Sequence, residues 1–319
     1  MRTLLITFFC LLLFAGSRSA LATTWDEPWH EQVVKNADYF VLAKVISSDA
    51  KSGITATIIR PLAGSSLAGT IKITAFCLLN ICSSSAGHGP EFPLEKADTC
   101  YFFLKKNTTG NYSIATPTTG FAAVANNNVY ATYRHSYHQA LVPMAVYEPT
   151  MTAIFQKYHG QAYDATYITG FIAKYLAMAP ANLDEAGLPT FFLQHVALET
   201  MYHLGLTTNY ALVLPFLHDT KNMHAQVGAA RALIGINTPD AKQQLLALLK
   251  DPNTGNFTKT LAVWTLASYQ PKELKTALQE LEKIASTKDN GFGGNIMDPR
   301  VCTEIPTVQA ALAKLTAAL

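Results

Sequence analysis

Three side chains with metal-binding chemistry occur at equal spacing in the second half of the sequence: His195, Glu199 and His203. Residues four apart share one face of an α-helix, so a helix here would bring two imidazoles and a carboxylate together. Zinc accepts such ligands, and a catalytic zinc keeps one position open for water or substrate. The spacing has two interpretations. The three residues form a zinc site, or they lie on a helix face that binds no cofactor and is either packed in the fold or solvated.

Motifs for other catalytic chemistry are absent from the sequence. It contains no G-x-S-x-G nucleophile elbow, no H-E-x-x-H zinc motif and no G-x-x-x-x-G-K-[ST] phosphate-binding loop. We therefore favour a non-catalytic protein without a cofactor. A metal-binding protein or metal-dependent hydrolase centred on His195, Glu199 and His203 is the alternative.

The segment that carries these residues lies in a helical second half of the chain. From Pro149 onward, apolar residues recur every three or four positions, which is the period of an amphipathic helix. Asp219 and Asp251, which are 32 residues apart, each close an apolar helix that is followed by a polar turn and a second apolar helix. A fixed period in this range is typical of stacked helix pairs.

The best of these units runs from His224 to Asp251 and resembles HEAT-like repeats. Its first helix reads Val-x-Ala-Ala-x-x-Leu-x-Gly, and its second is rich in leucine and ends in Lys-Asp. Looser copies lie at residues 196–219 and 258–284. The resemblance implies a short helical stack whose extended surface binds a partner protein.

The first half has the pattern of a small β-barrel. After a short amphipathic helix at residues 25–36, apolar residues alternate with polar ones over short segments, which indicates half-buried strands. Several closely spaced strands after a helix favour a closed antiparallel barrel. Strands are expected at residues 39–46, 54–59, 70–76, 101–104, 112–114 and 129–133.

The order of these elements resembles the OB-type barrel of netrin-like modules and tissue inhibitors of metalloproteases. The matching segments are the opening strand at 37–46, the Arg-Pro-Leu-Ala-Gly step at 60–64 and the Thr-Cys-Tyr-Phe-Phe-Leu strand at 99–104. In those inhibitors a cysteine at the mature N-terminus chelates the protease zinc. Here Thr23 and Thr24 stand at the expected start, so the resemblance implies the fold and not the inhibition.

The first 22 residues have the pattern of a secretory signal peptide. A basic start at Arg2 is followed by an apolar run over residues 4–15, and Ala20-Leu21-Ala22 offers small residues to a signal peptidase. The apolar run is shorter than the roughly 20 residues that span a bilayer. We therefore expect a mature chain without a membrane span, in the periplasm or outside the cell.

The charges of the mature chain balance. Removing Arg2 and Arg18 from the 24 basic residues leaves 22, equal to the 22 acidic ones. Nucleic-acid-binding domains carry a basic patch or stripe, and the sequence shows none. We expect no binding to nucleic acid.

Four cysteines remain after removal of the signal: Cys77, Cys82, Cys100 and Cys302. An even number in an exported protein favours disulfides, here two, in one of three possible pairings. Three of the four lie close together in sequence. We expect Cys302 to tie the C-terminal segment back to the first half.

These patterns predict a two-domain α+β protein. Residues 1–22 form the signal peptide, 23–147 a small antiparallel OB-like barrel domain with an N-terminal helix, and 148–319 an α-helical HEAT-like repeat domain. The leading hypothesis is an exported interaction or scaffolding module whose partner is another protein. A further hypothesis is binding of a small ligand or glycan at the domain junction, by Tyr137, His138 and Tyr147.

Overall fold

The computed structural model describes residues 23–83, 89–288, 290 and 300–319. The predicted signal peptide, residues 1–22, lies outside the described residues. The described residues form a mixed α+β fold, with a closed barrel followed by a helical region, as expected. Among them, no helix has both the length and the apolar character needed to cross a membrane.

Five strands of the first half close into a barrel. The hydrogen-bonded order is β6-β2-β3-β4-β7, and β7 pairs back with β6. All neighbours are antiparallel except β4 and β7, which run parallel. The strands are β2 (Tyr39–Asp49), β3 (Gly53–Gly64), β4 (Thr70–Phe76), β6 (Thr99–Lys106) and β7 (Tyr112–Ile114).

Every second side chain of the barrel strands points inward and fills the barrel interior. Val41, Ala43 and Val45 of β2 point into an interior cluster that also contains Ile54 and Phe102, because successive side chains of a strand point to opposite faces. The turn between β2 and β3 depends on Gly53, whose φ of +112° is disfavoured for other residues. A Cβ atom there would lie 2.1 Å from the carbonyl oxygen of Ile73.

Three further strands extend the sheet beyond the barrel, and a small ribbon and a helix lie near the N-terminus. Beyond β6 the sheet continues through β8 (Phe121–Ala125), β9 (Asn128–Thr132) and β10 (Gln139–Pro143), where β9 matches the last expected strand. Asn126 and Asn127 have positive φ and form the tight β8–β9 turn, which is the use that hairpins make of asparagine. The helix α2 (His30–Asn36) precedes the barrel strands, and a separate two-stranded ribbon pairs β1 (Thr24–Asp26) with β5 (Asn80–Ser83), which follows β4 in the chain.

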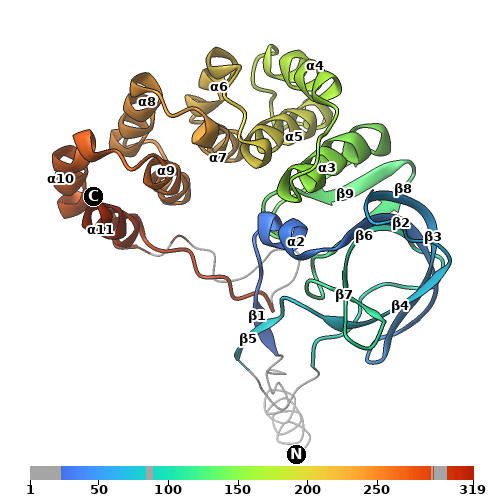
Figure 1. Cartoon of the computed structure of the whole chain (residues 1–319). Helices are drawn as coiled ribbons and strands as arrows, with labels where there is room; N and C mark the ends of the chain where they lie inside the picture. The colour runs from blue at the N-terminus through green and yellow to red at the C-terminus, as the bar shows by residue number, and fades with distance from the viewer. Residues whose placement is uncertain (1–22, 84–88, 289, 291–299) are drawn as a thin grey trace, which may run out of the picture.

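The helices of the second half form two layers along an arc that starts beside the barrel (Figure 1). Along the inner layer, α5 packs on α7, α7 on α9 and α9 on α11, and the outer helices α4, α6, α8 and α10 each pack on the inner helix that follows them. The helices are α3 (Met144–Tyr158), α4 (Ala165–Leu176), α5 (Leu188–Leu204), α6 (Tyr210–Leu217), α7 (Met223–Ala232), α8 (Pro239–Lys250), α9 (Asn256–Tyr269), α10 (Lys275–Ile284) and α11 (Val308–Ala318), with 3₁₀ turns at Leu233–Gly235 and Lys272–Leu274.

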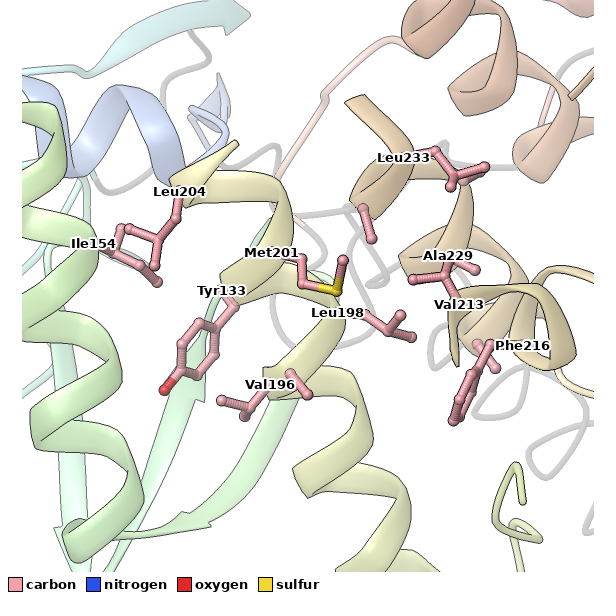
Figure 2. Close-up of a cluster of buried hydrophobic side chains, with 14 of the residues drawn as sticks. Tyr133, Ile154, Val196, Leu198, Met201, Leu204, Val213, Phe216, Ala229 and Leu233 are labelled. Carbon is pink, nitrogen blue, oxygen red and sulfur yellow. The ribbon is translucent and has the colours of Figure 1, made fainter. Parts of the chain in front are cut away.

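One continuous hydrophobic core joins the barrel to the helices. Tyr147 of α3 packs its ring on Tyr101 of β6 at 4.8 Å and on Phe40 of β2 at 6.1 Å, so α3 covers the outside of the barrel. Figure 2 shows the core continuing from Ile154 through the side chains of α5 to α6 and α7. The expected boundary at residues 147 and 148 lies within the first turns of α3.

The segment before α11 returns to the N-terminal ribbon. Val301 forms a parallel bridge with Trp25, and Cys302 is disulfide-bonded to Cys82, 220 residues earlier in the chain. The expected link between Cys302 and the first half is therefore confirmed. Residues 300–306, which we name the return segment, bridge the helical arc and β1 (Figure 1).

The expectation of a second disulfide is wrong. Cys77 and Cys100 are both free thiols. Cys100 lies inside the barrel on β6, where burial raises its pKa to about 12. Cys77 follows β4, receives a hydrogen bond from Asn36 Nδ2 at 3.2 Å and donates to the carbonyl of Ile114. The two thiols therefore occupy different layers, inside and outside the barrel wall.

Candidate functional site

Helix α5 places the three predicted metal ligands on one buried face. The helix has a proline in its first turn and ends at Gly205, which adopts the left-handed conformation that glycine favours at this position. His195, Glu199 and His203 are 2%, 0% and 3% exposed. The spacing therefore predicted their common helical face correctly, but each side chain has a different set of partners.

Glu199 is held by two arginines from outside α5. Arg134, from the loop after β9, donates from Nε to Glu199 Oε1 at 2.7 Å, and Arg231 of α7 donates from Nε to Oε2 at 3.0 Å. Burial raises the pKa of Glu199, but the two guanidinium groups outweigh it and hold the pKa below its usual value. Glu199 is thus an ion-paired carboxylate at the centre of the barrel–helix junction.

His203 uses both ring nitrogens in hydrogen bonds. Nε2 lies 2.6 Å from the carbonyl oxygen of Tyr133 and Nδ1 lies 2.8 Å from the hydroxyl of Tyr158. A carbonyl only accepts, so Nε2 carries the proton and the Tyr158 hydroxyl donates to Nδ1. Burial lowers the pKa of His203, and the ring is a neutral bridge between α5, α3 and the loop after β9.

His195 belongs to a cluster of three histidines. Its ring lies 4.2 Å from that of His138 in the β9–β10 loop, and His138 lies 4.5 Å from His224 of α7. Both ring nitrogens of His195 are buried without a hydrogen-bond partner in the described part of the chain. No group of three or more His, Cys, Asp or Glu side chains among the described residues is arranged to hold a metal ion.

The histidine cluster predicts a loss of stability in acid. Burial lowers the pKa of His224 to about 4, so the folded protein keeps this ring neutral while the unfolded chain protonates it near pH 6.5. The unfolded state binds more protons between these values, so stability is complete above pH 6.5 and falls as the pH is lowered toward 4.

We expect the free energy of unfolding to fall less for His224→Gln than for the wild type between pH 7.5 and pH 5. The difference should be about 1–2 kcal/mol, measured by urea denaturation at both pH values. Equal losses in the two proteins would contradict the assignment of a depressed pKa to His224. His159→Gln is the matched control, because that ring is partly exposed at the end of α3.

The predicted junction residues do not share one environment. Tyr147 is fully buried against the barrel, and His138 lies in the histidine cluster. Tyr137 packs its ring against Trp29 at 6.4 Å and against Phe257 of α9 at 5.5 Å.

The junction instead holds a different hollow, which we name the junction pocket. It has a volume of about 160 Å³ and lies between the inner helices of the arc and the start of α2. Two of the three tryptophans of the chain line it. Its lining residues are Trp29, Glu31, Tyr202, Arg231, Ile234, Leu261, Trp264 and Thr265.

Arg231 joins the buried ion pair to the junction pocket. Its guanidinium carbon lies 3.6 Å from the ring centre of Tyr202 and 5.3 Å from that of Trp29. Only Nε of this guanidinium donates a hydrogen bond within the described part of the chain, and Nη2 lies 3.8 Å from Glu31 Oε2. Burial lowers the pKa of Arg231, but Glu199 outweighs it and the net shift is upward, so the side chain stays charged.

Glu31 completes the polar side of the junction pocket. Its Oε1 accepts a hydrogen bond from the Tyr202 hydroxyl at 3.0 Å, and its Oε2 is buried without a hydrogen-bond partner among the described residues. The pocket thus pairs one cation and one carboxylate with three aromatic rings. Such a surface can stack on a ligand, donate hydrogen bonds and accept them.

Sequence reasoning missed the junction pocket, although one signal for it was present. Arg231 interrupts the apolar helix at 227–235 on a face expected to pack, and a charged residue at such a position needs a buried partner. Trp29 and Trp264 carry no comparable signal, because their spacing fits ordinary helix faces. Only the fold brings residues 29 and 264 to a ring separation of 5.4 Å.

A larger hollow of about 440 Å³ lies at the loops that precede α5 and α7. Asp219 accepts from the backbone of Lys221, and Asn222 caps α7 through the amide of Ala225, while Asn222 Nδ2 is buried without a hydrogen-bond partner in the described part of the chain. The junction pocket is the stronger candidate, because it sets the buried charge of Arg231, with unused hydrogen-bonding capacity, beside three aromatic rings.

Comparison with known proteins adds no relative: no family model, curated protein or solved structure matches the chain.

Proposed function

We propose that this is an exported, non-catalytic binding protein that recognises a protein partner through the junction pocket. The proposal of export rests on the signal pattern and on the Cys82–Cys302 disulfide, since disulfides persist mainly in oxidising compartments. The balanced charge of the mature chain argues against a nucleic-acid ligand.

The architecture supports a binding role. Strand order β2-β3-β4-β7-β6, with β4 and β7 as the parallel pair, agrees with an OB-type barrel. The two layers of paired helices from α4 to α11 agree with a HEAT-like stack, an architecture whose concave surfaces bind partners. The junction pocket lies on the inner layer of that stack, because α5, α7 and α9 supply Tyr202, Arg231 and Trp264.

The composition of the junction pocket carries the proposal. Tryptophan, tyrosine and arginine are the residues most enriched where protein interfaces concentrate their binding energy, and all three line this pocket. Arg231 is 3% exposed and has donor groups without acceptors. A partner that supplies an acceptor would therefore relieve a desolvation cost already present in the free protein.

We expect Trp264→Ala to weaken partner binding by at least about thirtyfold, the size of effect typical of such positions. The tagged protein is used to capture partners from periplasm and culture medium, and the affinity of each captured protein is measured by calorimetry. Tyr130→Ala is the matched control, because this aromatic residue is 46% exposed on β9 and lies outside the pocket. Capture of no specific partner, or equal affinity of both variants, would refute the proposal.

A further inference from the structure

The unused hydrogen-bonding groups of the junction pocket indicate which ligand chemistry it accepts. Arg231 Nη2 donates no hydrogen bond and Glu31 Oε2 accepts none within the described part of the chain, and the two atoms face each other at 3.8 Å in an ion pair too long for a hydrogen bond. A buried donor or acceptor left without a partner costs about 1–3 kcal/mol. The complementary ligand therefore carries an acceptor for Arg231 and an N–H or O–H donor for Glu31.

The charges around the pocket favour a neutral ligand. Arg134 and Arg231 already face Glu199 and Glu31, so these four side chains balance. A carboxylate ligand at Arg231 would place a third negative charge beside those of Glu199 and Glu31, and a cationic ligand at Glu31 would lie close to Arg231. Either charge would have to be desolvated without a free counter-ion.

The residues that line the junction pocket favour a ligand with a planar group on an apolar stem over a sugar ligand. Trp29 and Trp264 meet edge to face at an interplanar angle of 77°, and Ile234 and Leu261 add methyl groups beside them. Thr265 already donates to the carbonyls of Ala230 and Leu261. A sugar ring carries hydroxyls on all sides, and beyond Arg231 and Glu31 the side chains lining this pocket offer little to bond them.

We propose that the junction pocket recognises a side-chain carboxamide, that of Gln or Asn, on the partner protein. The carboxamide oxygen accepts from Arg231, its NH₂ group donates to Glu31, and its methylene stem lies against Ile234 and Leu261. This inference rests on the proposed protein-binding function, because it names the group that the partner inserts.

The test uses acetyl-glutamine N-methylamide as the probe and the indole N–H resonances of the full mature protein as the readout. Trp29 and Trp264 line the pocket, whereas Trp25 is fully buried and donates from Nε1 to Glu27 at 2.7 Å. We expect the probe to shift the Trp29 and Trp264 resonances saturably and to leave that of Trp25 unchanged. The acetyl-glutamate N-methylamide probe should bind about tenfold more weakly, as loss of a hydrogen bond to a charged group implies.

The variant Glu31→Gln sharpens the test. It keeps the shape of the side chain but removes one negative charge beside Arg231, so the glutamate probe should gain affinity and match or exceed the glutamine probe. Tighter binding of the glutamate probe to the wild type, equal shifts with glucose, or no saturable shift with the glutamine probe would overturn the carboxamide assignment. Partner capture that depends on Trp264 would survive each of these results, so the proposed function and this inference can fail separately.

Discussion

Replacing Glu199 with alanine should destabilise the protein by about 3–5 kcal/mol, the cost of removing one partner from a buried ion pair. Arg134 and Arg231 would remain in the core, with side chains that are 0% and 4% exposed, and would lose their shared carboxylate. Urea denaturation followed by tryptophan fluorescence measures the change in the free energy of unfolding.

Two further variants separate charge removal from a general effect of substitution. Glu199→Gln keeps the shape and one oxygen acceptor, so its loss of stability should be smaller than that of the alanine variant. Glu280→Ala removes a carboxylate from an ion pair with Lys283 whose side chains are about two-thirds exposed, and such pairs contribute less than about 1 kcal/mol. A loss for Glu199→Ala no larger than that for Glu280→Ala would contradict the role assigned to the junction.

Breaking the disulfide between Cys82 and Cys302 should have an effect of similar size. The bond closes a loop with a sequence separation of 220 residues, and the chain-entropy relation gives about 5 kcal/mol for a loop of this length. Cys302→Ser should therefore lower the free energy of unfolding by up to that amount, measured by denaturation under non-reducing conditions.

Substitution of the other cysteine, Cys82, is the control for Cys302→Ser. Cys82→Ser should match Cys302→Ser, and the double variant should lose no more than either single one. Dithiothreitol should destabilise the wild type to the same level and leave Cys302→Ser unchanged. An additive double variant, or a wild type insensitive to the reductant, would show that the return segment is held by its other contacts, including those with Trp25 and Glu27.

Patterns local to the chain predicted the fold well. Period-two alternation located the strands that became β3 and β4, short apolar or aromatic runs located those that became β2, β6, β7 and β9, and spacing of three and four located the helical half. The common face of His195, Glu199 and His203 follows from helix geometry alone. The disulfide partner of Cys302 did not follow, because pairing depends on which thiols the fold brings together and not on their number.

The candidate site was less predictable for the same reason. Zinc chemistry at Glu199 was a reasonable hypothesis from spacing, but Arg134 approaches from a loop 65 positions earlier and Arg231 from another helix. Neither ion pair could be predicted from a periodic pattern in the sequence. Tyr147, expected at the domain junction, is a further case: it lies wholly inside the core that α3 forms with the barrel, and no local pattern marks it as a core residue.

Site-specific crosslinking at position 264 tests the binding function most directly. A photoreactive p-benzoyl-phenylalanine replaces Trp264 in one protein and the exposed Tyr130 in a second, and both are irradiated in the compartment to which the producing cells export them. We predict one dominant crosslinked protein at position 264 that is absent at position 130. No crosslink at position 264, or the same products at both positions, would contradict a partner at the junction pocket.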